Sequence, residues 1–229
     1  MSPAFKSFKP DLIVEVTSVC DRRCSGCYAP NVVSKNDAEA LYKQSPSLFL
    51  TTEKLEVALK NNLHLQMSSI ALRGGEPSRH PKLIELIKAV RAFSKSDVFV
   101  ETHGRWILEN TDSTLDLLKV CKDTDTILKI SFDKMHGLKS EKLKDILDRI
   151  SLHSVRYAIA ITENSEIEFS VTRELCSFVP NDKIIYQPKA TASQELIQPR
   201  LGVINVAGHL SRQVTSHLSQ GAQDVEVAV

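Results

Sequence analysis

Short runs of β-branched and apolar residues alternate with amphipathic stretches along most of this chain, and the alternation restricts the fold more than any other feature. A repeated strand-then-helix pattern is typical of βα units around a parallel sheet. We expect strands at residues 12–17, 68–73, 97–102, 126–133, 156–162 and 183–187. Apolar side chains at helical spacing predict helices around residues 52–59, 81–93, 115–121, 143–150 and 171–178. Six βα units predict the α/β class and an open partial (β/α)6 barrel of the TIM type with parallel strands.

The ends of this pattern divide the chain. We expect a core domain over residues 1–190 and a C-terminal extension over residues 191–229. Residues 202–214 fit a hairpin, although the spacing of Leu210, Val214 and Leu218 also fits a helix; we favour the hairpin. Residues 31–50 form a polar connection that is longer than the roughly 2–6 residues usual after a strand. This connection could cover a cofactor or contribute to substrate recognition.

Three of the five cysteines, Cys20, Cys24 and Cys27, lie within eight residues after the first expected strand. Thiolates at these intervals can converge from one loop onto a single iron–sulfur cluster. Three thiolates leave one iron of a 4Fe–4S cluster without a protein ligand, and an open metal position is where chemistry can occur. A structural zinc site is the alternative, but such sites usually have four protein ligands. Cys121 and Cys176 lie in apolar helical stripes and are expected to be buried.

Alternation along the strands predicts a polar interior. In the fourth strand the apolar residues Leu128 and Ile130 share one face, whereas Lys129, Ser131 and Asp133 share the other. The apolar face should pack on helices, so the polar face should line the interior of the barrel. An interior of small and polar side chains is typical of a binding site, and the carboxyl ends of barrel strands carry the active site.

Some of these side chains have two interpretations. Arg73 and Lys129 could bind the carboxylate of a cofactor or a substrate anion, or they could pair with Glu15 or Asp133. His103, at the end of the third strand, could act on the substrate or only hold the turn.

Together these motifs resemble the radical S-adenosylmethionine (SAM) superfamily, whose signature is C-x3-C-x2-C after the first strand. Arg73-Gly74-Gly75-Glu76-Pro77 is similar to its G-G-E-P motif, and Glu101-Thr102-His103-Gly104 is similar to its E-T-N-G element. Ser131-Phe132-Asp133 resembles its S-x-D motif, and with the strands the match covers residues 11–190. One departure is Gly26, which stands where the family usually has an aromatic residue against the adenine of the cofactor. Tyr28 is the nearest candidate to cover that surface.

The resemblance implies a 4Fe–4S cluster on Cys20, Cys24 and Cys27, with SAM as the second cofactor. Reduction by one electron then cleaves SAM to methionine and a 5′-deoxyadenosyl radical, which removes a hydrogen atom from a small-molecule or peptide substrate. The expected electron donor is a protein of the flavodoxin or ferredoxin type. Carried over residue by residue, the resemblance assigns SAM binding to Gly74, Gly75, Glu76, Thr102, Ser131, Asp133, Thr162 and Tyr28. It leaves Arg73, His103, Lys129 and Gln187 for the substrate.

Two other functions fit the same motifs. An activating enzyme that installs a glycyl radical on a large partner protein would use the same cluster and would need a broad open face. A non-catalytic iron–sulfur sensor or binding protein would keep the fold without turnover, and its sequence support is the departure at Gly26.

Composition restricts the binding partners and the cellular compartment that we expect for this chain. A net charge of +1, from 29 basic and 28 acidic residues, gives no overall field that would attract nucleic acid or anionic lipid. No apolar stretch approaches the roughly 20 residues of a membrane span. The amino terminus lacks the apolar core of a secretory signal. Because the cysteine cluster requires reduced thiols, the cytoplasm is the expected compartment.

Overall fold

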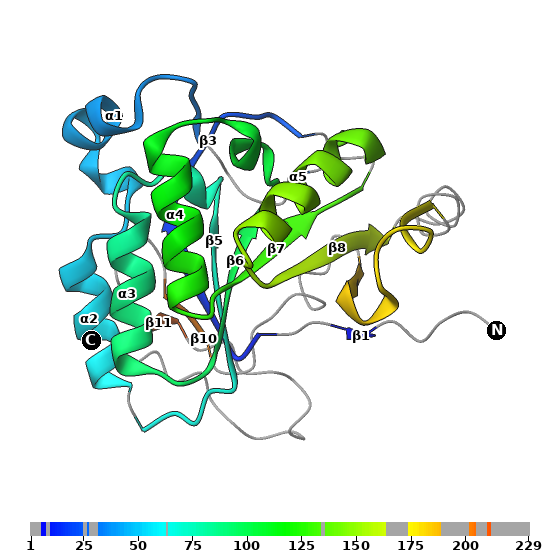
Figure 1. Cartoon of the computed structure of the whole chain (residues 1–229). Coiled ribbons are helices and arrows are strands. Elements are labelled where there is room, and N and C mark those ends of the chain that lie inside the picture. The colour runs from blue at the N-terminus through cyan, green and yellow to red at the C-terminus, as the bar shows by residue number, and fades with distance from the viewer. Residues whose placement is uncertain are drawn as a thin grey trace. The chain divides into compact units, whose positions relative to one another are not determined.

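The structure is a computed structural model that describes residues 6–7, 10–24, 27, 32–62, 64–133, 136–163, 174–188, 202–204 and 210–211. Contacts between residues divide the chain into two compact units. Unit 1 contains residues 1–8, 23–28 and 99–196, and unit 2 contains residues 9–22, 29–98 and 197–229. The boundary falls inside one strand, β6 (Asp97–Thr102), before Phe99 (Figure 1).

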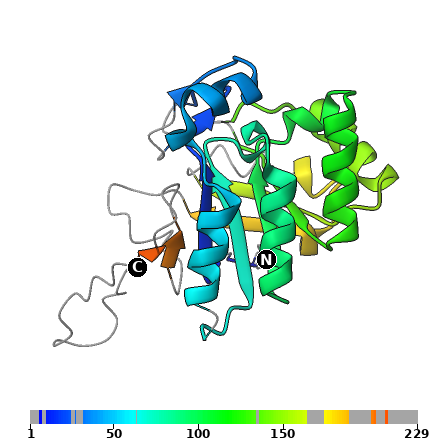
Figure 2. The same ribbon diagram turned by 90° about the vertical axis from the view of Figure 1, so that its left-hand side faces the viewer.

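The sheet of unit 2 is built around β2 (Leu12–Thr17), which is almost completely buried. β2 pairs in parallel with β5 (Ser69–Gly74) on one side and with β10 (Gly202–Ile204) on the other. β10 pairs antiparallel with β11 (Leu210–Ser211), the pairing that a hairpin requires, whereas Val214 and Leu218 of the alternative helix lie outside the described residues (Figure 2). These two strands therefore extend the sheet that contains the first expected strand. The expected domain boundary at residue 190 lies outside the described residues.

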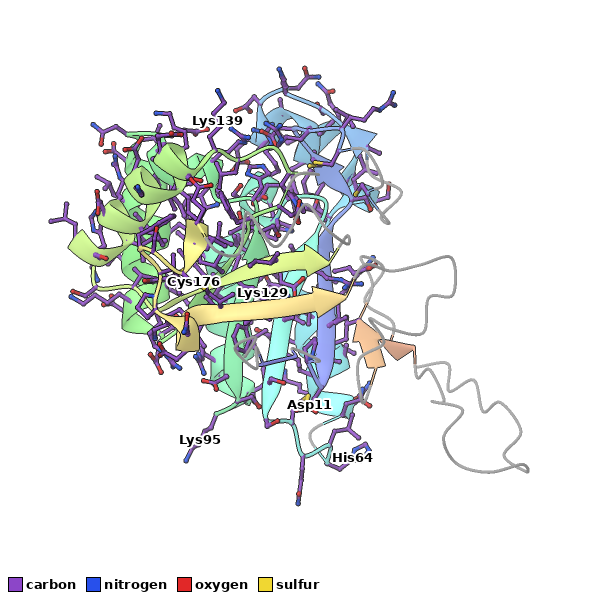
Figure 3. All side chains as sticks on the ribbon, turned by 90° about the vertical axis from the view of Figure 1, so that its right-hand side faces the viewer. Asp11, His64, Lys95, Lys129, Lys139 and Cys176 are labelled. Carbon is purple, nitrogen blue, oxygen red and sulfur yellow. The ribbon has the colours of Figure 1, made fainter. Side chains whose placement is uncertain are left out.

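A buried carboxylate joins the amino-terminal ends of β2 and β5. Asp11 Oδ2 accepts hydrogen bonds from the backbone N–H of Ser68 at 2.8 Å and from that of Ser69 at 3.1 Å. It also accepts from the hydroxyl of Ser68 at 2.5 Å (Figure 3). Hydrogen bonds to a charged group are stronger than neutral ones, so Asp11 fixes both strands at the end opposite to the motifs that follow them.

Two amphipathic helices of unit 2 pack against each other, α2 (Thr52–Asn61) and α3 (Leu83–Phe93). The hydroxyl of Thr51 caps α2 by accepting a hydrogen bond from the N–H of Lys54 at 3.3 Å, as a threonine before an apolar stripe predicts. Most apolar side chains of the two stripes are buried, among them Leu55 and Leu59 in α2, although Val57 is exposed; both helices are confirmed.

The segment 32–50 contains more secondary structure than the sequence indicated. It contains β4 (Val32–Val33), which pairs with β3 (Val19–Cys20), then α1 (Ala38–Gln44) and the 3-10 turn η1 (Pro46–Leu48). No strand or helix was predicted between residues 31 and 50, so these elements were missed. α1 is capped by Asp37 but buries none of its residues, so it has no apolar stripe from which a helix could be predicted.

Unit 1 contains the second set of parallel strands. Their order is β6, β7 (Ile127–Ser131), β8 (Tyr157–Glu163), β9 (Ile184–Pro188) and β1 (Lys6–Ser7), each parallel to its neighbour. The helices α4 (Asp112–Asp123) and α5 (Ser140–Leu152) bury the apolar stripes expected from the sequence, and both are confirmed. Shorter 3-10 turns are η3 (Arg105–Leu108) and η4 (Asn181–Lys183).

The two cysteines of the expected helical stripes behave differently. Cys121 is fully buried in α4, as predicted, and burial raises the pKa of its thiol to about 12. Cys176 is exposed, so the prediction that it is buried was wrong (Figure 3). Leu175 and Val179 supply the buried side of that turn, which leaves Cys176 on the outside. Of the helix expected around residues 171–178, the structure describes only residues 174–178.

The parallel α/β class is confirmed, since every expected strand occurs within two residues of its predicted start. Among the described residues, no helix is both long enough and apolar enough to cross a membrane.

Candidate cofactor site

The Gly74-Gly75-Glu76 motif follows β5 and is bound to the segment that leads into Cys20. The backbone N–H of Gly75 donates to the carbonyl of Thr17 at 2.7 Å, and that of Glu76 donates to the carbonyl of Val19 at 2.8 Å. A Cβ atom on Gly75 would lie 2.1 Å from the carbonyl oxygen of Val19, and one on Gly74 would lie 2.2 Å from that of Thr17. Only glycine permits this contact between the two backbones, so both glycines shape the segment that carries the first cysteine.

Glu76 is buried and stands at the start of the 3-10 turn η2 (Pro77–Arg79). Its Oε1 accepts a hydrogen bond from the backbone N–H of Ser78 at 3.1 Å. The carboxylate is thereby held at the carboxyl end of β5, where the sequence placed a SAM ligand. Its second oxygen gives Glu76 the chemistry to accept a hydrogen bond from an ammonium group.

His80 fixes the other end of η2 to the chain beside β2. Its Nδ1 accepts a hydrogen bond from the backbone N–H of Lys82 at 3.0 Å, so Nε2 carries the hydrogen donated to the carbonyl of Leu50 at 2.8 Å. Leu50 in turn donates its N–H to the carbonyl of Val16 in β2 at 2.8 Å. The ring of Phe49 lies edge-on to the imidazole, with the centroids 5.4 Å apart. Burial lowers the pKa of His80 to about 4, because this environment accepts only the neutral ring.

Folding should therefore weaken in acid through His80. The unfolded chain binds this proton near the ordinary pKa of 6.5, whereas the folded chain binds it only near 4. The contribution to stability is complete above the unfolded pKa and is lost as the pH falls toward the folded one, by at most about 3 kcal/mol. Urea unfolding at about pH 7.5 and about pH 4.5 measures the loss. His80→Phe keeps an aromatic ring but cannot titrate, so it should flatten this pH dependence; an equally steep dependence in the variant would exclude His80 as its source.

The cysteines of the motif have the donor chemistry of a cluster site. Cys20 is buried, Cys24 is half-buried and Cys27 is exposed, and none of the three forms a disulfide. The N–H of Cys27 donates to the carbonyl of Cys24 at 3.3 Å, which closes a turn between them. Among the described residues, no three acidic, histidine or cysteine side chains are gathered into a ready-made site for a metal ion. The donor set, three thiols on one short loop, fits an iron–sulfur cluster in type and number.

At the carboxyl end of β6, one expected SAM ligand, Thr102, and one expected substrate residue, His103, already have partners in the protein. The Thr102 hydroxyl oxygen accepts from the N–H of Gly104 at 2.9 Å and from the indole N–H of Trp106 at 2.9 Å. His103 Nδ1 accepts from the N–H of Arg105 at 3.2 Å, the turn-holding role that the sequence left open. Both residues are buried and stabilise the turn after β6.

Ser131 ends β7 and is partly exposed. Asp133 follows it and is buried, and its carboxylate binds His136, a residue that sequence reasoning missed. Of the other expected ligands, Tyr28 and the side chain of Thr162 lie outside the described residues, as does Gly26.

Both interior cations form ion pairs with the residue opposite them in the neighbouring strand. In unit 2 Arg73 is the register partner of Glu15, and Arg73 Nη2 lies 3.8 Å from Glu15 Oε1. In unit 1 Lys129 is the register partner of Glu101, and Lys129 Nζ lies 2.9 Å from Glu101 Oε1. The sequence named Glu15 correctly as a pairing partner, whereas the pairing of Lys129 with Glu101 was not expected.

Comparison with solved structures shows which proteins share this fold. SuiB from Streptococcus suis, bound to its precursor peptide SuiA, matches 86% of this chain and 44% of its own with a TM-score of 0.60 and 15% identity. The protein anSMEcpe with bound AdoMet matches 78% of this chain and 51% of its own with a TM-score of 0.55 and 18% identity. At such identities the likeness concerns the fold, and it confirms the partial barrel that the sequence predicts.

The sequence comparison then gives the family. Residues 13–150 match the family described as a 4Fe–4S single cluster domain. A GTP 3′,8-cyclase from Microcystis aeruginosa is 29% identical over 131 residues, which are 55% of this chain and 37% of the cyclase. A probable GTP 3′,8-cyclase from Metallosphaera sedula is 26% identical over 141 residues, which are 59% of this chain and 37% of that protein. The chain thus spans well under half the length of these curated relatives. It belongs to the 4Fe–4S single cluster domain family, in agreement with the resemblance of its motifs to the radical SAM superfamily.

Proposed function

We propose that this chain cleaves SAM reductively at a 4Fe–4S cluster and removes a hydrogen atom from a small-molecule or peptide substrate. The observation that carries the proposal is the contact of Gly74 and Gly75 with the backbone between Thr17 and Cys20. That contact brings a glycine-rich backbone and a buried carboxylate beside the segment that leads into the cysteine motif. The named relatives support both substrate classes, because they include GTP cyclases and a protein bound to a precursor peptide.

The cluster with SAM supplies a strongly reactive carbon radical after transfer of one electron. Cys20, Cys24 and Cys27 would hold the cluster as thiolates. Glu76, beside the backbone of Gly74 and Gly75, would accept hydrogen bonds from the amino group of SAM. Ser131 and Thr162 lie at the carboxyl ends of their strands, from which they would contact SAM. Such a site must hold the target carbon close and exclude water, because a primary radical reacts with whatever lies nearest.

Arg73, Lys129 and His103 are the residues that we assign to the substrate. Arg73 and Lys129 are paired with carboxylates, and His103 accepts a hydrogen bond within the protein. The three residues therefore keep their surroundings polar in addition to contacting the substrate. A reduced flavodoxin- or ferredoxin-type protein donates the electron, and the cytoplasm is the compartment in which the thiols stay reduced.

Anaerobic reconstitution tests the cluster. We expect the protein to take up about four irons, because three thiolates suffice for one cubane. The loaded and reduced protein should then convert SAM slowly to 5′-deoxyadenosine without substrate. Cys24→Ala should abolish iron binding, whereas Cys121→Ala and Cys176→Ala should not, since one thiol is buried in α4 and the other lies outside the motif. Equal iron loss in all three variants would contradict the assignment.

Glu76 allows a sharper test of SAM binding. Glu76→Gln keeps an oxygen that can accept from the N–H of Ser78, but it loses the charge. SAM affinity, measured by equilibrium binding to the loaded protein, should fall by about tenfold or more, because a hydrogen bond to a charged group contributes roughly 1.5–3 kcal/mol. Unchanged affinity in Glu76→Gln would remove Glu76 from the SAM ligands without affecting the cluster assignment.

A further inference from the structure

An aspartate–histidine pair lies just beyond the carboxyl end of β7. The side chain of Asp133 is 3% exposed, and its Oδ1 accepts from His136 Nδ1 at 2.8 Å. The same oxygen accepts the backbone N–H of His136 at 2.9 Å. The backbone contact alone would be an ordinary turn. The second contact means that the carboxylate also orients the imidazole ring.

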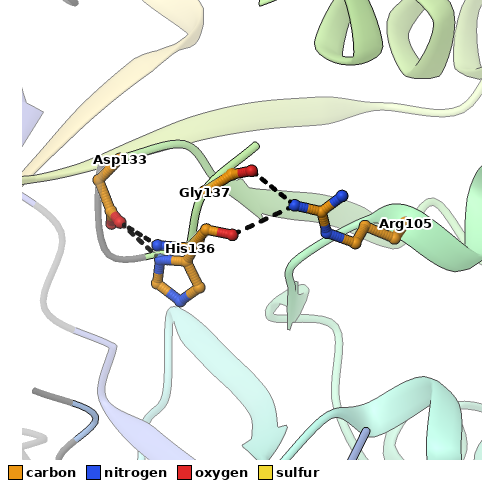
Figure 4. A network of polar contacts seen from close by, with 4 residues as sticks. All are labelled: Arg105, Asp133, His136 and Gly137. Atoms are coloured by element: carbon orange, nitrogen blue, oxygen red, sulfur yellow. Dashed lines mark hydrogen bonds and ion pairs between the residues drawn. The ribbon is translucent and has the colours of Figure 1, made fainter. Parts of the chain in front are cut away.

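The chemistry of the two groups determines where the hydrogen lies. A carboxylate only accepts hydrogen bonds, so Nδ1 of His136 must carry the N–H that is donated to Asp133. The neutral ring then has its lone pair on Nε2. In Figure 4 the edge of the ring that bears Nε2 points away from Asp133 and from Arg105. The side chain is 21% exposed, so part of the ring faces solvent.

The backbone of His136 is held by a residue that follows a second strand, β6. Arg105, in η3 after β6, donates from Nη2 to the carbonyl of Gly137 at 2.7 Å and to that of His136 at 3.3 Å (Figure 4). Gly137 adopts a φ of +58°, a conformation that favours glycine and turns the chain toward α5. The ring is thus fixed through its side chain by Asp133 and through its backbone by Arg105, which is the preorganisation expected of a functional group.

We propose that His136 accepts a proton or a hydrogen bond from the substrate through Nε2, and that Asp133 positions His136. The proposal rests on the proposed function, and it names the substrate class as one that presents an O–H or N–H group beside the reacting carbon. In the transfer, the O–H or N–H bond breaks, the substrate keeps the electron pair, and the proton forms a bond to Nε2. The resulting imidazolium is stabilised by the carboxylate of Asp133, as in other carboxylate–histidine pairs.

Histidine-selective 15N NMR of the full chain tests the pair without any cofactor. The chain has seven histidines, so comparison with His136→Gln identifies the signals of His136. At a pH where the imidazole is neutral, Nδ1 should be protonated and Nε2 should not. Asp133→Ala should move most of the hydrogen to Nε2, a change that a merely structural turn would not require. A ring protonated on Nε2 in the unchanged protein would overturn the proposal.

Acylation by diethyl pyrocarbonate, mapped by mass spectrometry, tests whether the lone pair can be reached. His80 is the internal control, because both of its ring nitrogens are engaged. We expect His136 to react at least about tenfold faster than His80, a ratio that corresponds to about 1.4 kcal/mol. Equal or slower modification of His136 would contradict the proposal. Neither measurement needs the cluster. A protein that failed to bind iron would therefore contradict the proposed function, whereas the roles of Asp133 and His136 would still be decided by the NMR and acylation results.

Discussion

Gly75→Ala should be among the most damaging single substitutions in this chain. The added Cβ would lie 2.1 Å from the carbonyl oxygen of Val19 and 3.0 Å from the amide nitrogen of Cys20. Backbone atoms cannot move aside as a flexible side chain can, so the two segments must separate. The separation would lengthen two hydrogen bonds, from Gly75 to Thr17 and from Glu76 to Val19. We expect the free energy of unfolding to fall by about 3 kcal/mol or more, from overpacking together with the weakened hydrogen bonds.

The measurement is urea unfolding together with 5′-deoxyadenosine formation, which should fall at least about tenfold per folded molecule. Gly137→Ala is the matched control. No atom lies within 4 Å of a Cβ at Gly137, so its cost is the strain of a positive φ, roughly 1–2 kcal/mol. If Gly75→Ala cost no more than Gly137→Ala, the close contact between the glycine motif and the segment before Cys20 would be wrong.

The elements that sequence analysis predicted well are those with a strong local signal. The strands β2 and β6 have the boundaries expected from their apolar runs, and the buried stripes of α3, α4 and α5 follow helical spacing. The cysteine motif needs no structure to be recognised, because thiols at this spacing have few other uses.

What the sequence could not show depends on contacts between distant segments. The register between β6 and β7 places Glu101 opposite Lys129, and no local pattern fixes that register. The pairing of β10 with β2 joins residues that are far apart along the chain. His136 was missed because it follows its strand in a loop, where the only signal is an aspartate three residues earlier. Polar contacts of this kind become evident only when the loop conformation is known.

Lys129→Met should destabilise unit 1 strongly. The side chain of Lys129 is 2% exposed and its Nζ lies 2.9 Å from Glu101 Oε1, while the side chain of Glu101 is 16% exposed. Removing the lysine leaves a largely buried carboxylate without its cation, and the cost of breaking a buried pair in this way is roughly 3–5 kcal/mol. Urea unfolding measures the loss. Lys119→Met is the matched control, because its ion pair with Asp123 lies at the surface of α4, and little change is expected there.

The double variant Lys129→Met with Glu101→Gln separates the structural role of the pair from a role on the cofactor. An amide is less costly to bury than an unpaired carboxylate, so the double variant should recover much of the stability that Lys129→Met loses. If the pair serves only the fold, 5′-deoxyadenosine formation should recover with stability, because the polar interior is again free of an unbalanced charge. A double variant that folds stably but binds SAM tenfold more weakly would place Lys129 or Glu101 on the cofactor. Equal stability of Lys129→Met and the unchanged protein would instead show that the carboxylate of Glu101 is solvated, and that the interior of unit 1 admits water beside β7.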